Sequence, residues 1–275
     1  MEKAKALLDA GELEGAVEQL ISDVKANPTD VTLRTFLFEA FCFAGEWERA
    51  EKQLDVIGHQ SMQTAIGVQA YRNNIKAERD RQRLFTDGLQ PHFLSEPPAY
   101  VDLLLTANNR LREGNLAEAR ETLDRAEEER PALAGKLNEN REFNDFRDYN
   151  DATGSVLELI VKDQYTWLPF EQIRRIEIAE PKNLRDLLWA NARIESLDGT
   201  MGEVFLPTLY AGSSAHENNQ VRLGRMTDWR EAGGDIYTGV GMRLFLVNDE
   251  EDKALLEVRS VEFNPATEES TSAVS

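Results

Sequence analysis

The chain has 275 residues and a net charge of −19, from 31 lysines and arginines against 50 aspartates and glutamates. Residues 1–150 and 151–275 are both acidic, so the sequence lacks the basic clusters by which proteins bind nucleic acid or an anionic membrane. It contains no apolar run of about 18 residues, which a membrane-spanning helix requires, and no signal peptide at its N-terminus. We therefore expect a cytoplasmic protein that binds neither nucleic acid nor membrane.

A pattern of glycine, a bulky apolar residue and alanine occurs three times in the first half of the sequence. Its glycines are Gly11, Gly45 and Gly114; the first two lie 34 residues apart, and the third follows after 69, about two such periods. Glycine allows a helix to end and the chain to reverse, and the small alanine allows two helices to approach closely. The period and the residue types resemble the tetratricopeptide repeat. The sequence therefore predicts tetratricopeptide-like α-helical repeats in the first half.

A different segment separates the second repeat unit from the third. Residues 61–86 have the composition of one long polar helix, with charges of alternating sign between Lys76 and Arg83. Pro91, Pro97 and Pro98 then mark a loop, and the third unit is expected to begin near Ala99.

Stacked helical repeats form a concave surface from the first helix of each pair, and such grooves commonly bind an extended peptide or an amphipathic helix. The repeat register predicts which residues line this groove. An alternative for Leu104 is the core, because Leu103, Leu104 and Leu105 cannot all face one way, and Cys42 stands in an apolar run typical of a buried residue. The predicted groove residues are Thr32, Thr35, Glu39, Cys42, Val101, Leu104 and Asn108.

The spacing of apolar residues changes near residue 150, from a helical period to the alternation of strands. The whole chain is therefore expected to be α+β, with a helical repeat domain over 1–150 that ends in a helix and linker at 141–151. Many short strands predict a small, mainly-β barrel or sandwich domain over 151–264, and residues 265–275 are expected to form a disordered acidic tail. Strands are expected at 155–162, 174–179, 192–197, 202–206, 242–247 and 254–263, with a charged hairpin connection at 248–253 and a short helix at 184–189.

No cluster of residues in the sequence predicts a metal site or a catalytic centre. The histidines lack a second histidine or cysteine at ligand spacing. Ser213 and Ser214 lie near His216, but closeness in sequence is not triad geometry. The stretch 239–241, Gly-Val-Gly, precedes a strand and lacks a third glycine, so packing glycines explain it better than a dinucleotide site. We therefore expect no metal, no cofactor and no enzymatic activity. The histidines are His59, His92 and His216.

The block from Gly224 to Trp229 is a second candidate for a binding patch. Arg225, Asp228 and Trp229 bring a cation, a carboxylate and a large aromatic ring together, a combination typical of interface hot spots. The structural alternative is that Arg225 pairs with an acid, Asp228 caps a turn and Trp229 fills the core.

Several motifs in the second half resemble those of one family. They are Trp167-Leu168-Pro169-Phe170, Leu184-Arg185-Asp186-Leu187-Leu188-Trp189, Val204-Phe205-Leu206-Pro207-Thr208-Leu209-Tyr210 and Leu223-Gly224-Arg225-Met226-Thr227-Asp228-Trp229. The first half agrees through Ala77-Glu78, Arg81 and Glu96-Pro97-Pro98. On these residues the chain resembles the ImpE family, also called SciE or TagJ, of type VI secretion clusters.

The resemblance implies an accessory protein of the secretion machine that acts as a non-catalytic adaptor. It implies binding to a helix of the small subunit of the contractile sheath, and a link to the ClpV-type ATPase that recycles contracted sheath. Two alternatives stay open: a helical-repeat scaffold or chaperone for an unrelated client, and an enzyme with an unrecognised site in the β half.

Overall fold

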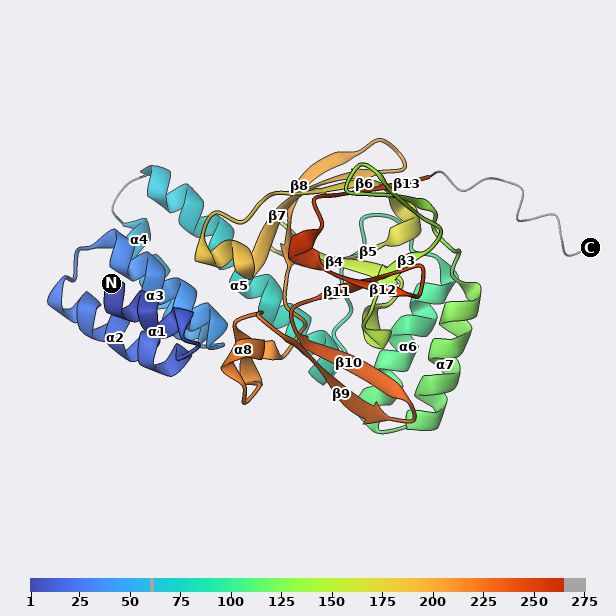
Figure 1. Cartoon of the computed structure of the whole chain (residues 1–275), viewed down its shortest axis with the longest axis horizontal. Coiled ribbons are helices and arrows are strands. Elements are labelled where there is room, and N and C mark those ends of the chain that lie inside the picture. Colours follow the sequence, from blue (N-terminus) through green and yellow to red (C-terminus); the bar gives the residue numbers. More distant parts are fainter. Residues whose placement is uncertain (60–61, 265–275) are drawn as a thin grey trace, which may run out of the picture.

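The computed structural model describes residues 1–59 and 62–264 and has an α+β fold, as predicted (Figure 1). In the described part of the chain, seven α-helices precede the first strand. The predicted disordered tail, residues 265–275, lies outside the described residues. The seven helices are α1 (Glu2–Asp9), α2 (Leu13–Ala26), α3 (Val31–Phe43), α4 (Trp47–Gly58), α5 (Met62–Asp87), α6 (Ala99–Glu113) and α7 (Leu116–Glu129).

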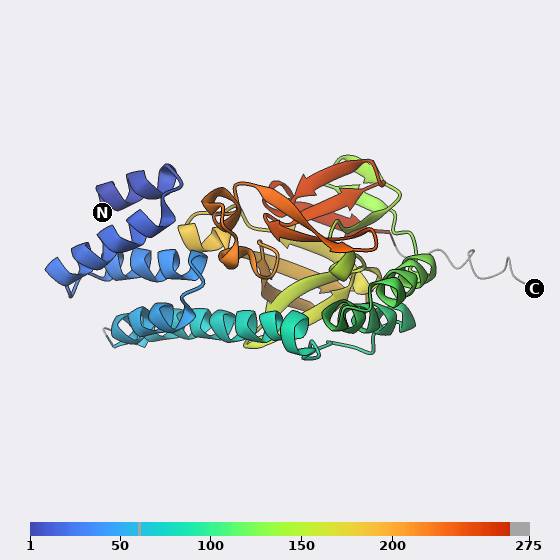
Figure 2. The same ribbon diagram turned by 90° about the horizontal axis from the view of Figure 1, so that it is seen from below.

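The three repeat glycines end a helix and reverse the chain, as the sequence predicted. Gly11, Gly45 and Gly114 have φ angles of +83°, +73° and +79°, a left-handed conformation in which a side chain would be strained. They separate α1 from α2, α3 from α4 and α6 from α7. The helices α1–α4 form an arm at one end of the molecule, and α5 runs from this arm along the β structure (Figure 2).

Thirteen strands follow α7 in the described residues, and all their pairings are antiparallel. They are β1 (Gly135–Leu137), β2 (Arg141–Phe143), β3 (Phe146–Asp148), β4 (Val156–Val161), β5 (Gln164–Pro169), β6 (Ile173–Ile178), β7 (Trp189–Ser196), β8 (Met201–Pro207), β9 (Thr227–Gly233), β10 (Ile236–Gly241), β11 (Leu244–Val247), β12 (Glu251–Ala254) and β13 (Ser260–Phe263). A short helix, α8 (Asn219–Arg222), lies between β8 and β9.

The largest sheet has eight strands in the order β2-β1-β13-β6-β7-β8-β4-β5, so its two outer strands do not pair with each other in the described structure. The sheet is thus open and not closed into a barrel. A three-stranded sheet, β12-β11-β3, packs against it through an aromatic cluster, and β9 and β10 form a separate hairpin. The cluster contains Phe143, Phe146, Phe170, Phe245 and Phe263.

Some predicted boundaries differ from the structure. The segment 141–151, expected to end the helical region, instead contains β2 and β3, and the β structure begins at Gly135. These strands are three residues long, too short for their alternation to stand out in the sequence. The segment 254–263 is interrupted by a turn of 3₁₀ helix, and the hairpin β9–β10 was not predicted because exposed polar residues occupy most of β9.

The helices and the large sheet share one hydrophobic core. Ile75 of α5 belongs to the same buried cluster as Val156 and Ile160 of β4 and Trp167 of β5. Trp189 of β7 joins this cluster as well. The helical and β parts of the chain are therefore packed together through buried side chains. Across residues 1–59 and 62–264, no helix is long and apolar enough to cross a membrane.

Candidate interaction site

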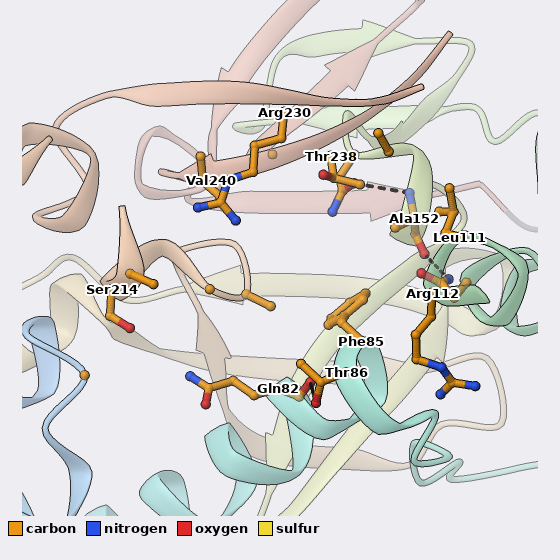
Figure 3. A pocket seen from close by; sticks show the side chains of 18 of the residues that line it. Gln82, Phe85, Thr86, Leu111, Arg112, Ala152, Ser214, Arg230, Thr238 and Val240 are labelled. Atoms are coloured by element: carbon orange, nitrogen blue, oxygen red, sulfur yellow. Dashed lines mark hydrogen bonds between the residues drawn. The ribbon is translucent and has the colours of Figure 1, made fainter. Parts of the chain in front are cut away.

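A pocket of about 560 Å³ lies where the helices meet the hairpin β9–β10 (Figure 3). Helix α5 contributes Gln82, Phe85 and Thr86 to its wall, and α6 contributes Leu111 and Arg112. The opposite wall comes from Arg230, Thr238 and Val240 of the hairpin, with Ser214 from the loop after β8. A volume of this size, mainly apolar with a few polar groups, is typical of small-molecule sites.

The charge of this pocket is opposite to that of the chain. Arg112 and Arg230 are the charged residues of its described lining, which contains no carboxylate. Figure 3 shows the two arginines on opposite sides of Phe85. The remaining described lining consists of apolar, small or neutral polar side chains, among them Trp47 and Gln82. The pocket thus combines a cationic rim with an apolar interior in an otherwise acidic protein.

Neither pocket arginine has an ion-pair partner in the described structure. No described carboxylate oxygen lies within 4.0 Å of Arg112 or Arg230, and both side chains are exposed. The pKa of Asp87 is lowered by hydrogen bonds from Thr86 and Arg83 and only weakly by the charge of Arg112. The Arg112 guanidinium lies against Gly88, just after α5, and neither guanidinium group has a described hydrogen-bond or ion-pair partner.

A network of buried charges lies beside the pocket and joins α5 to the β structure. The Arg81 guanidinium donates to both carboxylate oxygens of Glu158, at 2.8 and 3.1 Å, and to Glu78 at 3.2 Å. Arg243 donates to Glu158 and to Asp148 from its other side. All five side chains are at most 10% exposed. Buried charges are tolerated when they are paired and hydrogen-bonded, as these are.

The central carboxylate of this network stays ionised. Burial alone would raise the pKa of Glu158, but the positive charges of Arg243 and Arg81 outweigh burial and hold that pKa well below its usual range. Asp148 differs, because burial raises its pKa above the ordinary value and Arg243 offsets this only in part. The network was not predicted from the sequence, although Glu158 stands alone in the apolar strand β4 and Arg243 stands alone in the apolar run before β11.

The predicted groove residues do not form one exposed groove. Val101 and Leu104 of α6 are 0% and 3% exposed and lie within the core, the alternative considered for Leu104. Asn108 is buried and donates to the backbone of Ala152 at 2.9 Å.

The predicted groove residues of α3 are divided between core and surface. Cys42 is 1% exposed, as its apolar surroundings predicted. Glu39 is 6% exposed and pairs with Arg185 at 2.7 Å. Thr32 is exposed and Thr35 is half-buried, so these two remain accessible to a partner. Contact between the groove residues and a partner stays a prediction.

The second predicted patch is divided among different contacts. Arg225 donates to the carbonyl oxygens of Leu8 and Asp9, at 2.8 and 2.9 Å, and so holds the C-terminal end of α1. Asp228 is exposed and lies 3.2 Å from the His216 ring. Trp229 is half-buried and packs against the rings of Tyr149 and Tyr210. All three residues thus make contacts within the protein, and binding of a partner at this patch stays a prediction.

The arrangement around His216 does not form a catalytic triad. Its Nδ1 accepts a hydrogen bond from the Asn218 amide at 3.0 Å, and its Nε2 faces Asp228. Both ring nitrogens are therefore engaged, and neither is left to activate Ser214. Ser213 is buried and donates to the Tyr210 carbonyl oxygen at 2.5 Å. In residues 1–59 and 62–264, no group of three or more His, Cys, Asp or Glu is placed to hold a metal ion.

Comparison with known proteins gives consistent matches. Residues 140–262 match the family described as ImpE protein. The chain is 35% identical over 262 residues to TagJ, a type VI secretion system accessory component of Pseudomonas aeruginosa; the match covers 95% of this chain and 91% of TagJ. A crystal structure of a Vibrio parahaemolyticus protein superposes with a TM-score of 0.87 at 26% identity, covering 95% of this chain and 97% of that one.

Proposed function

Because this chain belongs to the ImpE family, we propose that it is a non-catalytic accessory protein of a bacterial type VI secretion system. The observation that carries the proposal is the 35% identity, over 95% of the chain, to a protein named as an accessory component of that system. We place the protein in the cytoplasm on the basis of the same role.

The proposed partners are the small subunit of the contractile sheath, bound through one of its helices, and the ClpV-type ATPase that recycles the sheath. The helical arm α1–α4 supports this mode, because a helix can lie along stacked helix pairs such as tetratricopeptide-like units. We propose that α1–α4 and α6–α7 are such units, on the evidence of their glycine turns. Thr32 and Thr35 of α3 remain accessible for this contact. The division of the chain into a helical domain and a β domain at residue 150 stays a prediction, and the described strands begin before it, at Gly135.

Binding of the purified small sheath subunit, followed by calorimetry, tests the adaptor role. We expect saturable binding, which Thr35→Arg weakens about tenfold by placing a bulky cation on α3. Thr200→Arg, in the exposed turn between β7 and β8, is the matched control and should bind as wild type does. Absence of any binding by wild type would contradict the proposal, whereas equal binding by Thr35→Arg would exclude only this face of α3. Adding the ATPase to the complex then tests the second partner.

A further inference from the structure

The pocket between the helices and the hairpin β9–β10 has charged and apolar groups to which the adaptor function assigns no role. Its described lining includes the half-buried apolar side chains of Phe85 and Leu111, and its charged groups are Arg112 and Arg230. A chain of net charge −19 repels anions over most of its surface, so the pocket is a local exception. Unpaired guanidinium groups beside apolar surface favour one kind of ligand, which carries an anionic group on an apolar body.

We infer that this pocket binds a small organic anion, with a carboxylate or similar group on an apolar body. The anionic group pairs with Arg112 or Arg230, and the apolar body lies against Phe85 and Leu111. The volume of about 560 Å³ is within the range of small-ligand sites and is much larger than an inorganic ion needs. This inference goes beyond the adaptor role and does not depend on it.

Polar side chains in the pocket add hydrogen-bonding positions. Gln82 and Thr86 project from α5, and Ser214 and Thr238 face them from the β side (Figure 3). Because these groups are neutral, they can orient a ligand without adding repulsion to an anion. No described lining residue supplies an acid or base, so the pocket is suited to binding and not to chemistry.

The position of the pocket gives ligand binding a structural consequence. One wall belongs to helices α5 and α6 and the other to the hairpin β9–β10. A ligand that contacts both walls stabilises their packing and raises the melting temperature of the whole protein by mass action. Thermal stability is therefore a second readout of binding, independent of any fluorescent reporter.

The test uses the full-length protein and 8-anilinonaphthalene-1-sulfonate, a fluorescent probe with an anionic group on an apolar body. We expect wild type to bind the probe at one saturable site. The double variant Arg112→Gln, Arg230→Gln should bind about tenfold more weakly, because the charge-assisted hydrogen bonds are lost. The matched control is Arg125→Gln, which removes an exposed arginine of α7 that lies 3.8 Å from Glu129 and should leave probe affinity unchanged.

A pair of competitors tests the ligand class on wild type alone, whatever the stability of the variants. Indole-3-propionate carries a carboxylate on an apolar body, and indole-3-propionamide is its neutral counterpart. Displacement of the probe and a rise in melting temperature with the acid, but not with the amide, would support the inference. Equal displacement by both, full displacement by sulfate alone, or equal probe binding by the double variant would overturn it.

Discussion

At the scale of single residues, Glu158 is the centre of the buried charge network. Its two carboxylate oxygens receive hydrogen bonds from Arg81 of α5 and from Arg243, which precedes β11. Two buried guanidinium groups therefore share this carboxylate, and each has one further carboxylate partner, Glu78 for Arg81 and Asp148 for Arg243. Removing that carboxylate leaves buried positive charge with too few partners. This should lower the free energy of unfolding more than the loss of an exposed ion pair does.

We predict that Glu158→Gln lowers the free energy of unfolding by about 3 kcal/mol. Urea denaturation measures this without the screening that guanidinium salts cause. The control is Glu48→Gln, which removes a carboxylate that is 76% exposed and pairs with Arg79; it should cost less than about 1 kcal/mol. A loss for Glu158→Gln as small as that of the control would mean that the network contributes little.

The same carboxylate predicts a dependence of stability on pH. The pKa of Glu158 in the folded protein lies below its ordinary value of 4.5, so its contribution is fully present above pH 4.5 and is lost as the pH falls toward the folded pKa. Asp148 and Glu39 have the opposite effect on the pH dependence of stability, because burial raises their pKa values in the folded protein. We therefore compare wild type with Glu158→Gln from pH 7 to pH 3. The gap between their free energies of unfolding should narrow below pH 4.5, and a constant gap would contradict this assignment.

The sequence predicts those features of the site that depend on neighbouring residues, and it does not predict those that depend on packing between distant elements. Burial of Cys42 follows from its apolar neighbours, and it is confirmed. The pocket residues Phe85, Arg112 and Arg230 carry no local motif, because they come from three separate elements. Only the packing of α5, α6 and the hairpin brings them together, so no reading of spacing along the chain could have found the pocket.

At the scale of elements, a glycine allows the hairpin β9–β10 to pack closely against its neighbours. A Cβ added at Gly239 would lie 2.3 Å from Cε2 of Tyr210. The Tyr210 hydroxyl donates to Asp148 at 3.0 Å, and it accepts from the Leu244 amide at 3.0 Å, so the ring has little freedom to move. The interpretation of residues 239–241 as packing glycines is confirmed at Gly239.

We predict that Gly239→Ala destabilises the protein by about 1–3 kcal/mol through overpacking against Tyr210. Gly202→Ala is the matched control, since Gly202 also lies in a strand but has no described atom within 4 Å of an added Cβ. Its effect should stay within about 0.5 kcal/mol. Thermal unfolding of both variants is the measurement, and Gly239→Ala should have the lower melting temperature. Equal melting temperatures would contradict the prediction and show that Tyr210 can move aside.

Most elements with strong local signals were predicted, although the strand β5 was missed despite Tyr165, Thr166 and Trp167, and elements without such signals were missed. The long helix α5 lies within a few residues of its predicted position, and so do the helix α6 and the strands β4, β6 and β8. Each has either clear periodicity or a run of β-branched and aliphatic residues. Of the three-residue strands, β1 pairs with β13 and β3 pairs with β11, which lie more than 90 residues later in the chain, and the edge strand β2 pairs only with β1. Pairing partners so distant leave no local pattern.

At the scale of the whole molecule, the shared core makes the helical and β parts interdependent. Ile75 of α5 and Trp167 of β5 belong to one buried cluster, and the Arg81–Glu158 pair crosses the same boundary. Neither part can unfold without exposing apolar surface of the other or separating buried charges.

We therefore predict a single cooperative unfolding transition. Far-ultraviolet circular dichroism follows mainly the helices, and tryptophan fluorescence reports on the buried Trp167 and Trp189. The two transitions in urea should coincide in midpoint and slope. Two separated transitions would instead show that the proposed domains 1–150 and 151–264 fold independently.

The place of β13 in the large sheet has a consequence for how the protein is made. This strand, Ser260–Phe263, lies between β1 and β6, so both are paired through it. During translation these edges of β1 and β6 therefore stay unpaired until Ser260–Phe263 has left the ribosome. Any product ending before Ser260 leaves two open strand edges of the kind that aggregate or recruit chaperones. Synthesis of β13 thus separates chains with a completed sheet from those truncated before it.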